Sequence, residues 1–291
     1  MRIVPFIILL LFSVKGIAQT SYSGYLGKYP ITMVMLHYSD GDTRAYYVYD
    51  KYDTPITING RFDDGKLTLF EKDNNNNITA TIKILDFDKK NNEITGQWTN
   101  TNHTKTYKIS LKKDFDISYG EDKEWNVKEL LQSQTTKEHY FKTIITKEKG
   151  DFFARITGIK IYEKKTDRLI QTIELDCQLS GIDNVRVGDY NFDGIQDFSV
   201  FEASYAGPNT SSIYILRNPD SEKYTVSDFQ GTSLEFDSAE KLIYEHNQCC
   251  AGTKHMTATY KVVNNKMVLI DKECLEYDDK KEDFIKVKCE Q

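Results

Sequence analysis

The chain has 291 residues, 39% of them hydrophobic and 28% charged, a composition typical of soluble globular proteins rather than disordered or membrane proteins. Aromatic residues make up 12%, including 19 Tyr, whereas Pro contributes only 5 residues and the formal net charge is −6. Since Tyr, Thr, Ile, Val and Phe favour strands, the composition predicts a β-rich fold and disfavours the Ala- and Leu-rich helical folds of ordinary dehydrogenases and kinases.

Residues 1–18 are predicted to form a secretory signal peptide. A charged start precedes an apolar run from Ile3 to Val14, and Gly16-Ile17-Ala18 supplies a small-x-small cleavage site. The apolar run is shorter than the roughly 20 residues that span a bilayer, so an uncleaved anchor is the less favoured alternative. We therefore expect an exported protein (periplasmic, envelope-associated or secreted) that starts near Gln19 and has no stable membrane span.

The predicted mature chain is acidic. Removal of Arg2 and Lys15 with the signal peptide leaves 36 Lys and Arg against 44 Asp and Glu, a net charge of −8. Such a surface repels phosphate backbones and attracts positive charge. We therefore expect no nucleic-acid partner, and calcium or a basic protein partner instead.

Residues 19–112 are predicted to form an N-terminal antiparallel β domain. Apolar runs recur about every ten residues, and Ile78 to Ile84 alternates apolar and polar side chains, as half-buried strands do. Turn-forming sequences such as Asn59-Gly60 and Asp63-Asp64-Gly65 lie between runs. The strands are expected to begin near Tyr22, Ile31, Ala45, Ile56, Lys66, Ile78, Ile94 and Thr106. Many short strands with tight turns predict a meander, closed as a barrel or packed as a sandwich.

Residues 113–138 break this rhythm. The stretch from Asp114 to Lys123 is polar and charged, and Trp125 to Gln132 has the composition of a short helix. We therefore predict a linker here, with a possible short helix, between the first domain and a second one.

Residues 139–291 are predicted to form a second β domain with more irregular connections. Asn264-Asn265 between two apolar runs is a hairpin-turn signal, because Asn tolerates positive φ. The predicted strands are Phe141–Thr146, Ala154–Glu163, Leu169–Leu175, Asn184–Val187, Asp197–Ala203, Ile213–Arg217, Lys241–His246, Met256–Val263, Met267–Tyr277 and Phe284–Lys288. The fold class predicted for the whole chain is therefore all-β.

The five cysteines are Cys177, Cys249, Cys250, Cys274 and Cys289. In an exported chain some are expected to pair, and an odd number leaves at least one thiol. Adjacent cysteines rarely bond to each other because the ring is strained, so we expect one of Cys249 and Cys250 to pair with Cys274 or Cys289. A zinc site is disfavoured because no CxxC occurs and no His stands at ligand spacing.

The segment from Asp189 to Asp197 is a candidate calcium loop. Asp189, Asn191, Asp193 and Asp197 occupy positions 1, 3, 5 and 9 of such a loop, with Gly194 at the sixth position, where the sharp turn needs a glycine. Ile195 at position 7 would contribute its backbone carbonyl. The flanking residues are strand-like and the bidentate Glu of an EF-hand is missing, so we predict a strand–loop–strand site with a structural Ca²⁺. The alternative is an Asp-rich turn without an ion, in which three carboxylates repel one another.

Catalytic motifs are absent from the sequence. There is no HExxH, GxSxG, P-loop or GxGxxG, and acidic residues are too numerous for one pair to be chosen as a glycosidase acid and base. Asp86-Phe87-Asp88 lacks the glycine of a calcium loop, and we expect a turn there. We therefore predict no catalytic residues, and no organic cofactor.

The run Gly188-Asp189-Tyr190-Asn191-Phe192-Asp193-Gly194-Ile195-Gln196-Asp197-Phe198 resembles a family of bacterial exported proteins that carry this loop on a small β fold. The family includes periplasmic immunity proteins against secretion-system effectors, similar in fold to periplasmic lysozyme inhibitors. The similarity covers about residues 139–291. It implies a lysozyme-inhibitor-like β domain that binds calcium and blocks a wall-degrading glycosidase with an exposed loop.

The loop that best suits this role is 204–212, which follows the strand after the calcium loop. It is small, polar and flexible in composition, and we expect Ser204, Tyr205, Gly207 and Asn209 to contact the partner, with Tyr205 filling a sugar subsite. A basic lysozyme-like glycosidase would be attracted by the acidic chain. The sequence thus favours a non-catalytic binding or inhibitor module. A cell-envelope structural or adhesive protein is the alternative, and a secreted hydrolase is a weaker one.

Overall fold

The computed structural model describes residues 18–289, so residues 1–17 of the predicted signal peptide lie outside the described part of the chain. The all-β prediction is confirmed: within 18–289 the helical structure is limited to the 3₁₀ segment η1 (Cys250–Gly252). The same residues contain no helix long and apolar enough to cross a membrane.

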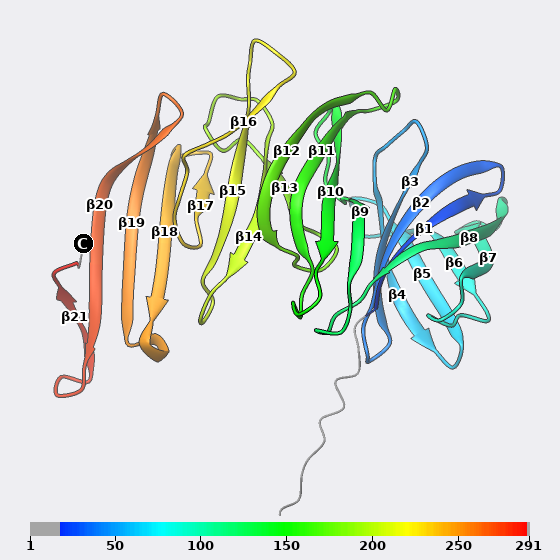
Figure 1. The fold of residues 1–291 in the computed structure, drawn as a ribbon, viewed down its shortest axis with the longest axis horizontal. Helices are drawn as coiled ribbons and strands as arrows, with labels where there is room; N and C mark the ends of the chain where they lie inside the picture. Colours follow the sequence, from blue (N-terminus) through cyan, green and yellow to red (C-terminus); the bar gives the residue numbers. More distant parts are fainter. Residues whose placement is uncertain (1–17, 290–291) are drawn as a thin grey trace, which may run out of the picture.

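The N-terminal half is a closed eight-stranded antiparallel barrel (Figure 1). Its strands are β1 (Ala18–Leu26), β2 (Tyr29–His37), β3 (Asp42–Tyr49), β4 (Ile56–Asp63), β5 (Lys66–Lys72), β6 (Ile78–Ile84), β7 (Glu93–Asn100) and β8 (Thr106–Ile117). Each strand pairs with the next, and β1 also pairs with β8, which closes the ring. All eight predicted strands are present, and of the two predicted forms the barrel is the correct one.

The predicted turn at Asn59-Gly60 is wrong, because both residues lie in the middle of β4. A Cβ on Gly60 would stand 1.8 Å from the Thr68 backbone oxygen, and one on Gly24 would stand 2.1 Å from that of Ser110. These glycines therefore allow neighbouring strands of the curved barrel wall to approach closely, which is one of the uses of glycine inside a strand.

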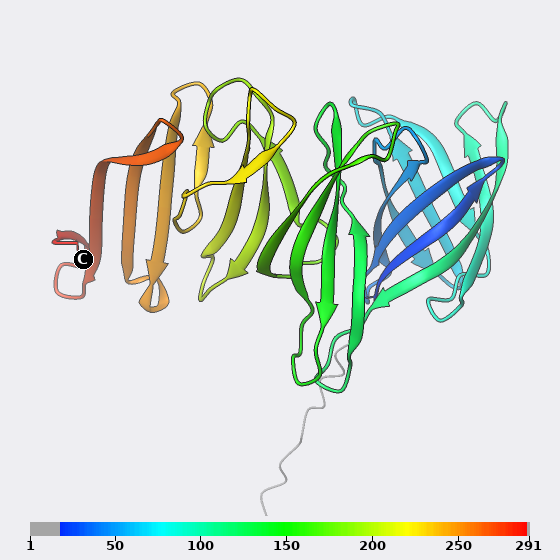
Figure 2. The same ribbon diagram turned by 45° about the horizontal axis from the view of Figure 1, so that its top comes forward.

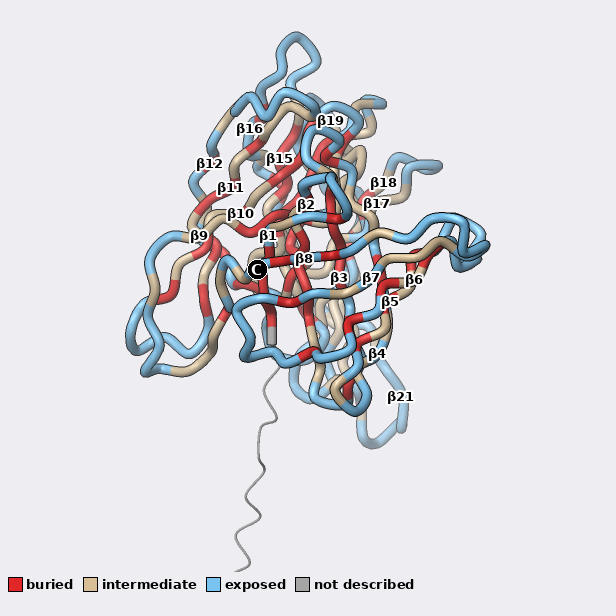
Figure 3. The backbone as a smooth tube through the Cα atoms, turned by 90° about the vertical axis from the view of Figure 1, so that its right-hand side faces the viewer, coloured by how far each residue is buried: buried red, intermediate tan, exposed pale blue. Residues whose placement is uncertain are grey.

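Apolar side chains fill the inside of the barrel. The buried interior residues are Tyr22, Leu26, Ile31, Met33, Met35, Ala45, Tyr47, Ile58, Leu67, Leu69, Ile82, Ile84, Phe87, Ile94, Ile109 and Leu111. Most strands contribute every second residue, as expected for one buried face. On β2 and β3 the outward-facing Val34, Leu36, Tyr46 and Val48 are buried as well, because they pack in one core with the following sheets. Figure 3 shows buried residues along the strands and exposed ones at the turns.

The prediction for residues 113–138, a linker with a possible short helix, is wrong both for the start of the linker and for the helix. Strand β8 continues to Ile117, and the predicted helix is a strand, β9 (Trp125–Leu131), paired with the next strand β10 through Leu131↔Lys142 and Leu130↔Thr143. Leu130 and Leu131 are buried in the shared core. Hydrogen bonding to a neighbouring strand and burial of the two leucines therefore override the weak local helix preference of this segment.

The remaining chain forms three antiparallel sheets that follow the barrel in a row (Figures 1 and 2). The first contains β9, β10 (His139–Lys147), β11 (Arg155–Glu163) and β12 (Leu169–Gln178). The second contains β13 (Val185–Gly188), β14 (Asp197–Ser204), β15 (Thr210–Arg217) and β16 (Tyr224–Val226). The third contains β17 (Glu235–Asp237), β18 (Leu242–Cys249), β19 (Lys254–Val263), β20 (Lys266–Asp278) and β21 (Asp283–Val287). The ten predicted strands are present, while β9 and the three-residue β16 and β17 were not predicted.

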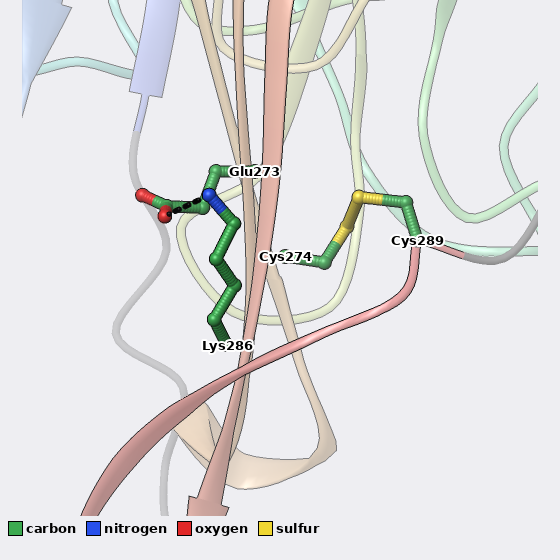
Figure 4. Close-up of a disulfide and its surroundings, with 4 residues drawn as sticks. All are labelled: Glu273, Cys274, Lys286 and Cys289. Carbon is green, nitrogen blue, oxygen red and sulfur yellow. Dashed lines mark ion pairs between the residues drawn. A yellow bond between two sulfur atoms is a disulfide. The ribbon is translucent and has the colours of Figure 1, made fainter.

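The disulfide prediction is wrong in its pairing. Cys274 on β20 bonds to Cys289, just beyond β21 (Figure 4). Cys249 and Cys250 are free and exposed. Strands β20 and β21 are neighbours, whereas β19 separates Cys249 from β20. Two strand spacings are about 10 Å, which exceeds the Cα separation that a disulfide can bridge.

Candidate metal-binding loop

The candidate calcium loop connects β13 and β14, which pair antiparallel up to Gly188↔Asp197. The predicted strand–loop–strand arrangement is therefore confirmed. Gly194 adopts φ +89°, the left-handed region in which a Cβ is strained, so the glycine at the sixth position is required by the backbone.

Backbone amides curl the loop around its acidic side chains. The Asp189 carboxylate accepts bonds from the amides of Asp193 (3.0 Å) and Gly194 (2.8 Å). The Asp193 carboxylate accepts one from the amide of Ile195 (2.8 Å). These bonds hold Asp189 and Asp193 on the same turn, at the positions that the sequence assigns to calcium ligands.

Asp197 is the most deeply buried member of the predicted ligand set, with no exposed surface, and Asn191 is also buried. Its two carboxylate oxygens accept bonds from the amides of Tyr190 (3.0 Å) and Arg217 (2.8 Å). Burial raises the pKa of Asp197 to about 6; the two amide bonds oppose this shift and the charges of Asp193 and Asp189 add to it. Within residues 18–289 no Lys or Arg forms an ion pair with any of these three carboxylates.

Asn191 connects the loop to the third sheet. Its side-chain amide donates to Asp193 Oδ2 (2.9 Å) and to Oδ1 of Asn265 (3.0 Å), in the turn between β19 and β20. On the other side, the Gln196 side chain accepts a bond from the amide of Lys137 (2.9 Å), which precedes β10 of the first sheet. The loop therefore contacts segments from both neighbouring sheets.

Two aromatic residues of the loop, which the sequence interpretation did not assign, form its apolar base. Tyr190 packs edge-on against Tyr214 (4.9 Å between ring centroids) and Phe236 (4.8 Å), and Phe192 also faces Phe236 (6.3 Å). They stand at positions 2 and 4 of the candidate calcium loop, between the predicted ligands. The alternation of polar and aromatic residues is the sequence signal that could have identified them as packing residues. This packing joins the loop to β15 and β17.

The donor set fits a hard divalent cation in chemistry but is not assembled as a coordination shell. All predicted donors are oxygens, of Asp189, Asn191, Asp193 and Asp197 and the carbonyl of Ile195, as Ca²⁺ prefers. The carboxylates are engaged by backbone amides, and among residues 18–289 no group of three or more His, Cys, Asp and Glu side chains is arranged to hold a metal ion. Ion binding would therefore require these side chains to rearrange.

The predicted partner loop is shorter and better anchored than its composition indicated. Strand β14 extends to Ser204 and β15 starts at Thr210, leaving Tyr205 exposed at 54% and Gly207 exposed at φ +73°. Asn209 is buried, and its amide nitrogen donates to the backbone oxygens of Ala206 (3.1 Å) and Gln248 (2.7 Å). Asn209 therefore fixes the loop to β18 and is not a surface for a partner, in contrast to the prediction.

A hollow lies between the barrel and the first sheet, with a volume of about 740 Å³. Tyr140 and Tyr162 stack in it at 5.2 Å, and the Tyr140 hydroxyl donates to Asp167 (2.7 Å). Burial raises the pKa of the nearby Asp53. The lining residues range along the chain from Ser23 to Asp167, so no local sequence pattern could indicate this hollow.

No protein-family model and no curated protein matches this chain. The assignment of a function therefore depends on the geometry of the loop at 189–197, the exposed loop that follows it and the charge of the chain.

Proposed function

We propose that the protein is an exported calcium-binding β protein that acts as a non-catalytic binding or inhibitor module. The observation that carries the calcium part is the loop at 189–197, which holds Asp189 and Asp193 on one turn and Asp197 at the start of β14, all without an ion-pair partner among the described residues. The loop contacts the first and third sheets. Asp197 is fully buried there. A buried carboxylate near two others is stabilised most simply by a bound cation.

The ion would have a structural role. Asp189, Asn191, Asp193, Asp197 and the carbonyl of Ile195 would hold it, and its charge would offset the repulsion among the carboxylates. Because Asn191 bonds to Asn265 and Tyr190 packs on Phe236, fixing the loop also fixes the second sheet against the third.

Calcium binding is tested by thermal and urea unfolding in excess calcium and in EGTA. Exported calcium modules of this kind bind in the 10⁻⁴–10⁻³ M range, so 10 mM calcium is expected to add about 1.4–2.7 kcal/mol of stability. Asp193→Ala should lose this increment. Asp88→Ala, in an exposed turn without the loop glycine, should retain it. Equal stability of the native protein in calcium and EGTA would contradict calcium binding.

The binding role is supported by charge and by Tyr205. The net charge of −8 without the first 18 residues favours encounter with a basic protein, and Tyr205 offers an exposed aromatic ring on a loop that Asn209 anchors. We propose a basic lysozyme-like glycosidase as the partner class, in keeping with the resemblance of the calcium-loop segment. The cleft of a glycosidase would accept the tip of this loop.

Inhibition is tested by following the lysis of cell walls by several lysozymes with and without the protein. The account predicts that the protein slows lysis, and that added salt or the variant Tyr205→Ala restores the lysis rate. The control variant Tyr52→Ala, at a barrel residue that is 71% exposed, should inhibit as well as the native protein. Unchanged lysis with every lysozyme would exclude inhibition and leave the calcium result standing. Retention on envelope material would then favour an adhesive role, and release of sugar or peptide would favour a hydrolase.

A further inference from the structure

The turn between β18 and β19 places two thiols in contact. Cys249 ends β18, where it pairs with Lys254, and Cys250 follows it in η1. Their Sγ atoms are 3.0 Å apart, and both residues are exposed. In a regular strand, neighbouring side chains point to opposite faces, so this proximity is not what strand geometry alone would give.

The backbone of the turn accounts for the contact. Cys250, Ala251 and Gly252 all have positive φ, at 56°, 55° and 84°, whereas Cys249 is extended. Thr253 fixes the turn, because its amide (3.2 Å) and its hydroxyl (2.8 Å) both donate to the Cys250 carbonyl. Positive φ at two consecutive residues other than glycine is uncommon and unfavourable, and such strain is concentrated at functional positions.

None of the other three cysteines is available to form a disulfide with Cys249 or Cys250. Cys274 and Cys289 are bonded to each other, and β19 separates them from Cys249. Cys177 is buried on β12, where burial raises the pKa of its thiol to about 12. Because five is an odd number, one thiol must stay unpaired, and the burial of Cys177 makes it that thiol. Cys249 and Cys250 then remain as partners; adjacent cysteines rarely bond because the ring is strained, but this turn already brings their Sγ atoms to 3.0 Å.

We propose that Cys249 and Cys250 are a redox modification site and form a reversible disulfide between adjacent residues. The bond would form by thiol–disulfide exchange with a small-molecule or protein disulfide. The thiolate of one cysteine attacks the sulfur–sulfur bond of the oxidant and releases its first thiol. The neighbouring thiolate then attacks this mixed disulfide, forms the Cys249–Cys250 bond and releases the second thiol. The pair loses two protons and two electrons, and the oxidant disulfide is reduced to two thiols.

The site adjoins the loop that carries Tyr205. Gln248, directly before Cys249, exchanges backbone bonds with the Asn209 side chain, donating at 3.2 Å and accepting at 2.7 Å. Formation of the disulfide ring would therefore fix the strand end to which this loop is attached.

The test uses the purified full-length protein in a series of reduced and oxidised glutathione mixtures. Samples are quenched in acid, alkylated with a maleimide under denaturing conditions and digested with trypsin. Lys241 and Lys254 flank both cysteines, so they remain together in peptide 242–254. As the mixture becomes more oxidising, the doubly alkylated form of this peptide should give way to an unalkylated form. The mass of that form should be two hydrogen atoms below the mass of the peptide with two free thiols. Dithiothreitol should reverse the change.

Two outcomes would overturn the proposal: double alkylation at the most oxidising ratio, or conversion to glutathione adducts or linked dimers in place of the intramolecular bond. Cys250→Ser is the matched control, since its remaining Cys249 is exposed and should give those adducts or dimers. Hydrogen exchange across residues 204–212 should slow on oxidation of the native pair. Equal exchange in both states would contradict the link to the Tyr205 loop, independently of the mass result.

Discussion

The barrel and the last sheet represent two different ways of stabilising antiparallel strands. In the barrel every strand has two hydrogen-bonded neighbours, and apolar side chains fill the interior. The hairpin of β20 and β21 has no buried residue, and β21 forms an open edge. The closed sheet is therefore stabilised by its interior. In the last sheet, β17 to β19 pack in a smaller cluster around Ile243, whereas the β20–β21 hairpin depends more on local links such as the Cys274–Cys289 bond.

The barrel nevertheless shares a core with the sheets beside it. Val34 and Tyr46 on its outer face belong to the same buried cluster as Phe141 and Phe198. The buried Tyr46 hydroxyl donates to the Leu131 carbonyl at 2.6 Å. The contrast is therefore strongest between the two ends of the molecule, and it weakens toward the middle sheets.

The largest expected effect is a cavity in the barrel. Ile82 on β6 is fully buried, so Ile82→Ala should lower the free energy of unfolding by about 2–5 kcal/mol, from lost apolar burial and the cavity left behind. Urea unfolding followed by tryptophan fluorescence measures this, because Trp98 lies on the adjacent strand, where it pairs with Ile82.

Ile78→Ala is the control on the same strand, since that side chain is 44% exposed. It should change stability by less than about 1 kcal/mol. Similar losses for the two variants would mean that the barrel interior is not the packed core described above.

A smaller and more local effect is expected from the disulfide. Its loop spans 15 residues, so Cys274→Ser should cost about 3 kcal/mol in the chain-entropy estimate. The Glu273–Lys286 ion pair beside it (Figure 4) is exposed to solvent and therefore weakened by screening, so it cannot replace the bond. Limited proteolysis should then cleave near β21 while the barrel stays intact. Equal protease sensitivity of both ends would contradict this.

The smallest effect is a pH dependence in the first sheet. His139 is buried with its ring nitrogen 2.8 Å from the Tyr224 hydroxyl, and burial, aided by the charge of Arg217, lowers its pKa below 6.5. As the pH falls below 6.5, the unfolded chain takes up a proton before the folded one, so stability is lost. His139→Gln should show a shallower decline of the melting temperature with acid. Identical slopes for the two proteins would exclude this contribution.

Local patterns predicted most of the strands and the meander of the first half, but not the elements whose state depends on distant partners. The alternation from Ile78 to Ile84 identified β6, and Asn264-Asn265, both at positive φ, form the predicted hairpin turn. By contrast, β9 has a weak local pattern, and its state is decided by pairing with β10, which lies outside any local window. The cysteine pairing failed for the same reason, because strand order decides which thiols can meet.

At the candidate site, spacing predicted a loop between two strands, and the structure has Asp189 and Asp193 on one turn and Asp197 at the start of β14. The sequence could not indicate that Asn191 reaches Asn265 or that Asn209 faces inward, because both contacts join residues far apart in the chain. The positions of the candidate ligands can thus be predicted from residue spacing alone. Their contacts with the neighbouring sheets cannot, because these depend on the fold.

The most direct test of the central claim is amide hydrogen exchange of the native protein with calcium and with EGTA. The account predicts that calcium slows exchange in residues 188–198 and in the Asn264-Asn265 turn, while the barrel strands exchange equally in both conditions. No change at 188–198, or an equal change throughout the barrel, would contradict a calcium loop that links the open sheets.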